Sequence, residues 1–306
     1  MKKDLVSLAE LTPQELQSYL DDAVALKRLK KAGHARPLLA GKTLGMIFQK
    51  PSLRTRVSFE VGMLQLGGHA LYLSPNEIQL GVRESVPDVA RVMARYCDGI
   101  MARVFAHADV LTMAQNASVP VINGLSDFSH PCQGLADFLT IYEHKGPLAG
   151  LKLAFVGDAN NVYHSLLFAA AKLGTHIACA SPAGYGPGAR VLDMARPWAA
   201  ASGSQITATT DPFEAVRGAD VIYTDVWTSM GQEAEAEKRR VAMRPFQVNV
   251  TLVAAAKKDV IVMHCLPAHR GEEITDDVVD GRHSVVFDQA ENRMHAQKAV
   301  LVRLMG

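Results

Sequence analysis

The chain has 306 residues, more than a single hydrophobic core usually supports, so two domains are expected. Hydrophobic residues make up 48% of the chain and charged residues 21%, which excludes a disordered or collagen-like protein. The formal net charge of +1 excludes a global field that would attract a polyanion, so any phosphate recognition has to be local and no nucleic-acid partner is expected.

The N-terminal segment does not have the pattern of a signal peptide. Two lysines are followed by apolar residues that Glu10, Glu15 and Asp21 interrupt. No apolar run approaches the roughly 20 residues that cross a bilayer, so no membrane partner is expected. The four cysteines lie far apart and form no CxxC pair: Cys97, Cys132, Cys179 and Cys265. This spacing predicts free thiols in a reducing cytoplasm.

The first half of the chain alternates helical and strand patterns. Thr12 and Pro13 are typical of a helix start, and a second helical pattern ends before Gly67. Further helices are predicted at 84–96 and 134–144. The predicted strands cover residues 43–48, 69–73, 99–104 and 119–123. The alternation predicts an α/β fold with a mostly parallel sheet flanked by helices.

A break in the helical pattern at residues 145–148 marks the expected domain boundary. Beyond it, a helix at 163–173 and a last helix at about 288–305 are predicted. The predicted strands cover residues 151–158, 175–180, 220–225, 260–265 and 284–287. We expect two α/β domains, 1–145 and 146–287, with a C-terminal helix, 288–306, that returns to the first domain. The charge run 233–240 is typical of a solvated helix or a mobile loop.

The segment from Ser52 to Arg56, sequence SLRTR, lies between a predicted strand and a predicted helix. Backbone N–H groups at a helix start, two hydroxyls and two guanidinium groups would converge there and favour an anion such as phosphate. The alternative is an N-cap serine followed by surface arginines.

A second cluster, from His130 to Asp137, follows a strand and opens a helix. His130 and Gln133 offer the hydrogen bonds that a planar carbamoyl group needs, although a helix entry with a satisfied histidine would look the same. Arg103, at the end of a strand, is either an anion ligand or part of a structural ion pair.

Polar residues also follow strands in the second half. Asp225 can hold an ammonium group, and Cys265 can orient an amine, unless it is a small buried apolar residue. His264 and Cys265 are adjacent strand residues that should point to opposite faces, so no metal site is expected. The turn at 157–161 lacks the GxGxxG fingerprint and the chain lacks a Walker motif, which disfavours these two kinds of nucleotide-binding fold.

Together these motifs resemble the aspartate and ornithine carbamoyltransferase superfamily over essentially the whole chain. The segment 52–56 is similar to its SxRTR signature, 130–133 to its HPxQ motif, and 264–267 to the HCLP motif of the ornithine branch. Asp225 followed by Ser229-Met230-Gly231 resembles the ornithine-binding loop. The resemblance implies transfer of the carbamoyl group of carbamoyl phosphate to the δ-amine of L-ornithine. It also implies no cofactor, and a homotrimer or a multiple of trimers.

The resemblance also assigns residue roles. The catalytic residues would be Arg103, His130, Gln133 and Cys265. The residues that bind carbamoyl phosphate would be Ser52, Leu53, Arg54, Thr55, Gln79, Arg103, His130, Pro131, Cys132, Gln133, Cys265, Leu266 and Arg293. The residues that bind ornithine would be Asn161, Asp225, Ser229 and Met230. Gln79 would contact phosphate across a subunit interface. Many family members have threonine in place of Leu53, whose backbone N–H can still donate to phosphate.

Other functions remain open at this point. The acceptor amine could belong to N-acetylornithine, putrescine or aspartate, and biosynthetic and catabolic enzymes would share the motifs. A catalytically silent member of the fold is a further alternative, although the arginines and the pair of His130 and Gln133 are all present.

Overall fold

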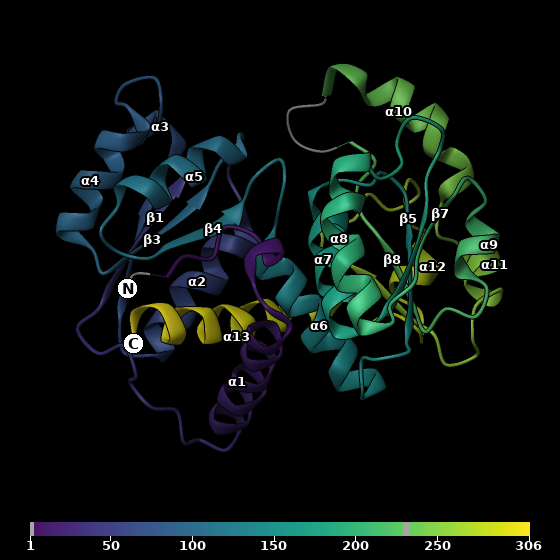
Figure 1. Ribbon diagram of the computed structural model, residues 1–306, viewed down its shortest axis with the longest axis horizontal. Helices are drawn as coiled ribbons and strands as arrows, with labels where there is room; N and C mark the ends of the chain where they lie inside the picture. The colour runs from purple at the N-terminus through teal and green to yellow at the C-terminus, as the bar shows by residue number, and fades with distance from the viewer. Residues whose placement is uncertain (1–2, 229–232) are drawn as a thin grey trace. The chain divides into compact units, whose positions relative to one another are not determined.

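The computed structural model describes residues 3–228 and 233–306. The chain forms two compact units, one from Met1–Leu139 together with Glu291–Gly306 and the other from Thr140–Ala290. Each unit contains its own parallel sheet flanked by helices, which confirms the predicted α/β fold class (Figure 1). Among the described residues, no helix combines the length and apolar character needed to span a membrane.

The sheet of the first unit has the strand order β2-β1-β3-β4. Its strands, all parallel, are β1 (Thr43–Phe48), β2 (His69–Leu73), β3 (Gly99–Arg103) and β4 (Val121–Leu125). Fully buried Ile47, Ile100 and Val121 belong to its core. Because the chain moves from β1 to one side and later returns on the other, β1 and β3 flank a topological switch point. The loops that leave these two strands are therefore neighbours.

The helices of the first unit cover this sheet. They are η1 (Leu8–Glu10), α1 (Pro13–Lys31), α2 (Leu53–Gln65), α3 (Pro75–Ile78), α4 (Val86–Tyr96), α5 (His107–Asn116), the start of α6 (Pro131–Lys145) and most of α13 (Val286–Met305). Helix α1 begins as predicted, with a capping box between Thr12 and Glu15. Helix α13 lies beside α1 and α2 (Figure 1), where Lys27 Nζ donates to Asn292 Oδ1 at 2.7 Å.

The sheet of the second unit has the order β7-β6-β5-β8-β9. Its parallel strands are β5 (Lys152–Val156), β6 (His176–Ala180), β7 (Ile206–Thr209), β8 (Val221–Thr224) and β9 (Ile261–His264). Val156, Ile222 and Val262 are fully buried in its core. Here the order reverses between β5 and β8, so the turns that follow these strands meet at the carboxyl edge.

The helical segments of the second unit include the last part of α6 and the first turn of α13. The others are α7 (Asn161–Leu173), α8 (Ala189–Ser202), α9 (Pro212–Val216), η2 (Glu233–Glu235), α10 (Ala236–Met243), η3 (Arg244–Phe246), α11 (Val250–Ala254) and α12 (Asp276–Val279).

Two expectations about this unit need correction. The strand predicted at 284–287 is wrong, because Ser284 makes only an isolated bridge with Val262 and helix α13 begins at Val286. A short apolar run next to a helix start does not by itself distinguish a strand from a helix. The charge run 233–240 is helical, as one alternative predicted, but Arg239 within it is buried rather than solvated.

Candidate active site

Thr55 is the meeting point of the first polar cluster. Ser52 is the N-cap of α2, and its hydroxyl accepts the Thr55 N–H at 3.3 Å and donates to Thr55 Oγ1 at 3.1 Å. The same oxygen, Thr55 Oγ1, accepts from Arg293 Nη2 at 2.7 Å and from Arg103 Nη1 at 3.4 Å. Residues that are far apart in the sequence, from α2, β3 and α13, therefore bring two guanidinium groups to the start of one helix. Helix starts and guanidinium groups both favour anions.

His130 lies in the same positive environment. Burial, reinforced by the nearby charges of Arg293, Arg103, Lys50 and Arg54, holds the pKa of His130 well below its usual range. The imidazole is therefore neutral at physiological pH and keeps one N–H donor and one acceptor nitrogen. A neutral imidazole inside a cationic cluster can donate a hydrogen bond to a carbonyl oxygen and polarise it, without itself being a protonated acid.

Helix α6 begins at Pro131, directly after His130, and places the rest of the predicted HPxQ motif. Gln133 Nε2 donates to Asp137 Oδ1 at 2.8 Å, which fixes the direction of the amide, and Oε1 is a buried acceptor that has no partner among the described residues. Cys132 is fully buried, and burial raises the pKa of its thiol to about 12. Cys132 is consequently a neutral packing residue, while Gln133 presents an acceptor to an N–H donor.

The surroundings of this cluster differ from the prediction at two places. Arg56, expected to join the anion site, instead pairs with Glu60 and stacks over the Tyr72 ring at 3.9 Å. Lys50, which belongs to none of the sequence motifs, is 8% exposed; its Nζ lies 4.6 Å from the centre of the Phe105 ring, and its charge acts on His130. A lysine before a proline and a capping serine carries no distinctive spacing, so the sequence offered no signal for it.

Gln79 and Leu266 share an unusual backbone conformation. Within residues 3–228 and 233–306, they are the non-glycine residues with positive φ, at 44° and 59°. Side chains with a Cβ rarely adopt this region, and such strain is concentrated at functional sites. For both residues, the family resemblance alone predicts a role in binding carbamoyl phosphate.

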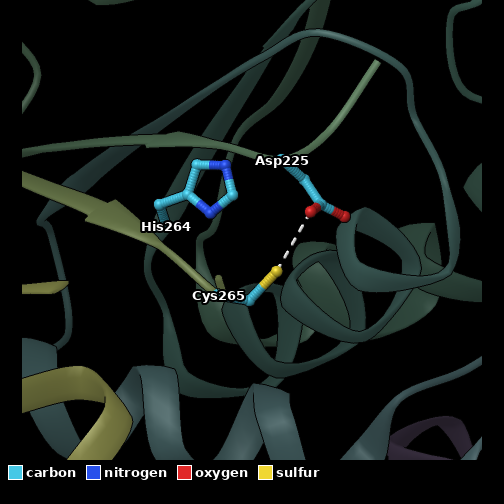
Figure 2. Close-up of side chains that lie close together, drawn as sticks. All are labelled: Asp225, His264 and Cys265. Atoms are coloured by element: carbon cyan, nitrogen blue, oxygen red, sulfur yellow. Dashed lines mark hydrogen bonds between the residues drawn. The ribbon is translucent and has the colours of Figure 1, made fainter. Parts of the chain in front are cut away.

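The second unit gathers its polar groups around Asp225, which follows β8. Asp225 Oδ1 accepts the Val226 N–H at 2.8 Å and the Cys265 thiol at 3.1 Å, and Oδ2 accepts from Asn160 Nδ2 at 2.7 Å. Figure 2 shows the thiol of Cys265 directed at this carboxylate. Because a carboxylate only accepts hydrogen bonds, the thiol hydrogen points toward Asp225.

His264, the last residue of β9, holds the turn that carries Cys265. Its Nδ1 accepts the Leu266 N–H at 2.9 Å, so its proton is on Nε2, which donates to Glu273 Oε1 at 3.1 Å. Both residues of this pair are fully buried. The fixed imidazole thus stabilises the strained Leu266 and the orientation of the preceding cysteine.

The expectation that His264 and Cys265 point to opposite faces is wrong. Cys265 lies just beyond the end of β9, where strand alternation no longer applies, and the ligand atoms of Asp225, His264 and Cys265 lie within 4.8 Å of one another (Figure 2). This spacing could hold a metal ion. Since hydrogen bonds engage both ring nitrogens of His264, we assign the cluster to the orientation of Cys265 instead.

The remaining predicted ornithine ligands fall at two places. Asn161 is the first residue of α7, whose N-cap Asn160 accepts the N–H groups of Val162 and Tyr163. Ser229 and Met230 lie outside the described residues.

Two parallel sheets that each present polar side chains at their carboxyl edge are the architecture of an α/β enzyme acting on small polar substrates. Family models match nearly the whole chain. The carbamoyl-P binding domain of aspartate/ornithine carbamoyltransferase matches residues 3–143, and the Asp/Orn binding domain of the same family matches residues 149–304. The chain belongs to the aspartate/ornithine carbamoyltransferase family.

Individual relatives agree with this placement. The chain is 59% identical over 304 residues to the ornithine carbamoyltransferase of Pyrococcus horikoshii, a match that covers 99% of this chain and 96% of the relative. It is also 59% identical to the anabolic ornithine carbamoyltransferase of Pyrococcus furiosus, with the same coverage. The solved structure of ornithine carbamoyltransferase from Pyrococcus furiosus superposes with a TM-score of 0.97 at 58% identity, covering 99% of this chain and 97% of that one.

Proposed function

We propose that this enzyme transfers the carbamoyl group of carbamoyl phosphate to the δ-amine of L-ornithine, giving L-citrulline and phosphate, in arginine biosynthesis. Full-length relatives at 59% identity are named ornithine carbamoyltransferase, and one of them is named anabolic. The observation that carries the proposal is the convergence of Arg103 and Arg293 on Thr55 Oγ1 at the start of α2. The same two guanidinium groups help to keep the pKa of His130 low.

Residues 1–145, with the C-terminal helix 288–306, form the carbamoyl phosphate domain of this proposal. The phosphate is bound at the start of α2 by backbone N–H groups and by guanidinium groups, and the carbamoyl group is bound by His130 and Gln133. Neutral His130 donates to the carbonyl oxygen, and Gln133 Oε1 accepts from the carbamoyl NH₂. The full set of residues is Ser52, Leu53, Arg54, Thr55, Gln79, Arg103, His130, Pro131, Cys132, Gln133, Cys265, Leu266 and Arg293.

Residues 146–287 form the ornithine domain. Asn161, Asp225, Ser229 and Met230 bind the amino-acid end of ornithine, and Asp225 pairs with its ammonium group. Cys265 and Leu266 lie beside the reacting amine. The hydrogen bonds from Asn160 and Cys265 to Asp225 support this assignment, because they hold the carboxylate in one orientation.

The reaction is a direct displacement. A δ-ammonium group has a pKa near 10.4 in water, so the amine has to lose a proton before it attacks. The neutral nitrogen then attacks the carbamoyl carbon, and the C=O electrons move onto oxygen to form a tetrahedral intermediate. Collapse of this intermediate breaks the bond to the phosphate oxygen and restores the carbonyl. The departing phosphate takes the proton that the nitrogen releases.

Charge stabilisation accounts for most of the catalysis in this mechanism. Arg54, Arg103 and Thr55 stabilise the charge on the leaving phosphate, and His130 and Arg103 stabilise the developing oxyanion. No covalent intermediate with the enzyme forms, so Cys265 orients the amine and does not act as a nucleophile. Orientation of the two substrates supplies the rest of the rate enhancement.

A homotrimer, or a multiple of trimers, in the cytoplasm completes the proposal. Gln79 would reach the phosphate of a neighbouring subunit, which agrees with its strained φ of 44° at the end of α3. Analytical ultracentrifugation tests the assembly. A monomer with full activity would contradict it.

An assay of the carbamoylated product formed from each of a panel of amines, which is citrulline in the case of ornithine, tests the activity. We expect turnover with L-ornithine and at least about 100-fold lower kcat/KM with N-acetylornithine, putrescine and aspartate, since a site built to pair with charged groups rejects analogues that lack them. Preference for another amine, or no citrulline from ornithine, would overturn the proposal.

A further inference from the structure

The segment before His130 contains an irregularity next to the anion cluster. Strand β4 pairs with β3 in the register Ala102 to Asn123, but the next pair is Arg103 to Leu125, so Gly124 is an extra residue. A side chain at Gly124 would meet Met101 Sδ at 2.4 Å. Such bulges redirect the residues beside them and are common near active sites. The bulge lies opposite Arg103 and directly after Asn123.

Asn123 is fully buried, and its amide nitrogen contacts three oxygens. Asn123 Nδ2 lies 2.9 Å from Val6 O, 3.1 Å from Ser126 Oγ and 3.3 Å from Ser129 O. The backbone of Asn123 is held as well, since its N–H donates to Leu5 O at 2.8 Å. The side chain is thus a fixed donor that links the strand to the turn at 126–129.

That turn ends at His130. The Ser126 N–H donates to Ser129 O at 2.9 Å, and the Ser129 N–H donates to Ser126 Oγ at 3.3 Å. His107 Nδ1 lies 2.8 Å from the same hydroxyl. The turn therefore has its own closing bonds, and the amide of Asn123 ties it to β4. Ser129, whose carbonyl oxygen contacts the Asn123 amide, directly precedes His130 in the chain.

We propose that Asn123 is a positioning residue for His130. Asn123 touches neither substrate, but it determines where His130 contacts the carbamoyl group. The inference rests on the proposed carbamoyl transfer and adds a residue to it. The proposed phosphate ligands Ser52, Arg54 and Thr55 belong to α2 and its N-cap and not to the turn at 126–129, so Asn123 governs recognition of the carbamoyl group and leaves these ligands in place.

The substitution Asn123→Asp separates these two effects. It keeps the shape of the side chain but places a carboxylate oxygen against Val6 O and Ser129 O, where only a donor is satisfied. The turn then moves away from β4 and takes His130 with it. We expect kcat/KM for carbamoyl phosphate to fall about 100-fold, the effect of a displacement of about 1 Å. The affinity for inorganic phosphate, measured by calorimetry, stays within about twofold of wild type.

A double-mutant cycle with His130→Ala shows whether the effect passes through that histidine. Once His130 is removed, Asn123→Asp should lower kcat/KM by no more than about twofold further, because the group it positions is absent. Independent losses that multiply in the double variant would overturn the proposal. Equal losses of phosphate affinity and of turnover in Asn123→Asp would overturn it too, since they indicate general damage to the domain.

Two further proteins complete the experiment. Asn249→Asp is the matched control, because Asn249 caps α11 by accepting the Leu252 N–H, which a carboxylate also does, and its kinetics should equal those of wild type. If Asn123→Asp does not fold, Ser126→Ala removes the hydroxyl that the amide contacts and should show the same selective loss. Wild-type citrulline formation, measured alongside, separates a failure of the proposed function from a failure of this inference.

Discussion

The two polar clusters are built on opposite principles. In the first unit, Arg103 and Arg293 converge on the Thr55 hydroxyl, and with Lys50 and Arg54 they depress the pKa of His130. In the second unit, Asp225 is surrounded by its own hydrogen-bond donors, Asn160 and Cys265. Like charges held together are stabilised by a bound anion, whereas a carboxylate satisfied by the protein is oriented before any ligand arrives. We therefore expect the first cluster to supply the charge that binds an anion and the second to supply a carboxylate of fixed orientation.

Removal of a charge from the first cluster should have the largest effect. Arg54→Ala removes a proposed phosphate ligand from the half-buried end of this cationic cluster, and we expect kcat/KM for carbamoyl phosphate to fall about 1,000-fold. Steady-state kinetics and phosphate calorimetry measure it. Arg56→Ala is the matched control, because Arg56 pairs with Glu60 outside the cluster and its loss should change kcat/KM by less than about threefold. Unchanged affinity in Arg54→Ala would remove the phosphate assignment.

A change in the second cluster should affect the other substrate. Asp225→Asn removes the negative charge and one of the two acceptor oxygens, and we expect kcat/KM for ornithine to fall about 100-fold. Phosphate affinity should not change. Asp193→Asn, which alters an exposed carboxylate on α8 paired with Arg196, serves as the control in the same ornithine titration. Loss of phosphate binding in Asp225→Asn would show that the two clusters do not have separate roles.

Cys265→Ala sharpens the comparison further. The thiol donates to Asp225, and without it the carboxylate is less firmly oriented, so turnover should fall about 10-fold while citrulline still forms. Complete inactivity in a variant that binds both substrates would mean that the thiol takes a covalent part in the reaction.

The smallest expected effect concerns stability. Burial lowers the pKa of His295 from 6.5 to about 4, despite the hydrogen bond to Glu291. Between these values the unfolded chain binds a proton that the folded protein does not, so the free energy of unfolding decreases as the pH falls below about 6.5. At pH 6, this one group lowers the free energy of unfolding by about 1 kcal/mol relative to its value at high pH. Urea unfolding of His295→Gln from pH 7 to pH 5 should show a shallower decline, and a slope identical to wild type would exclude His295 as the cause.

Much of the architecture could be predicted because its signals are local. The strands that become β1, β5 and β8 are short apolar runs followed by polar turns, and the start of α1 has its capping box. The run 284–287 failed because β-branched residues at the start of α13 look like a strand when their neighbours are unknown. The short strand β7, with intermediate and exposed positions, gave no clear apolar run.

The site was harder to predict than the fold. Ser52, Arg54, His130 and Cys265 stand in recognisable motifs, but the contact between Arg293 and Thr55 joins residues 238 positions apart. Neither residue's local sequence encodes that pairing, which depends on how α13 packs beside α2. Arg56 was expected in the cluster because sequence spacing does not reveal that Tyr72 and Glu60 engage its side chain.

A crystal structure with a phosphonate mimic of carbamoyl phosphate linked to ornithine tests the central claim most directly. We predict phosphonate oxygens at about 2.7–3.2 Å from the Arg54 and Arg103 guanidinium groups and from the start of α2, with the mimic's carbonyl oxygen accepting from His130. A mimic bound elsewhere, or one whose phosphonate leaves Arg103 and His130 without contact, would contradict the account.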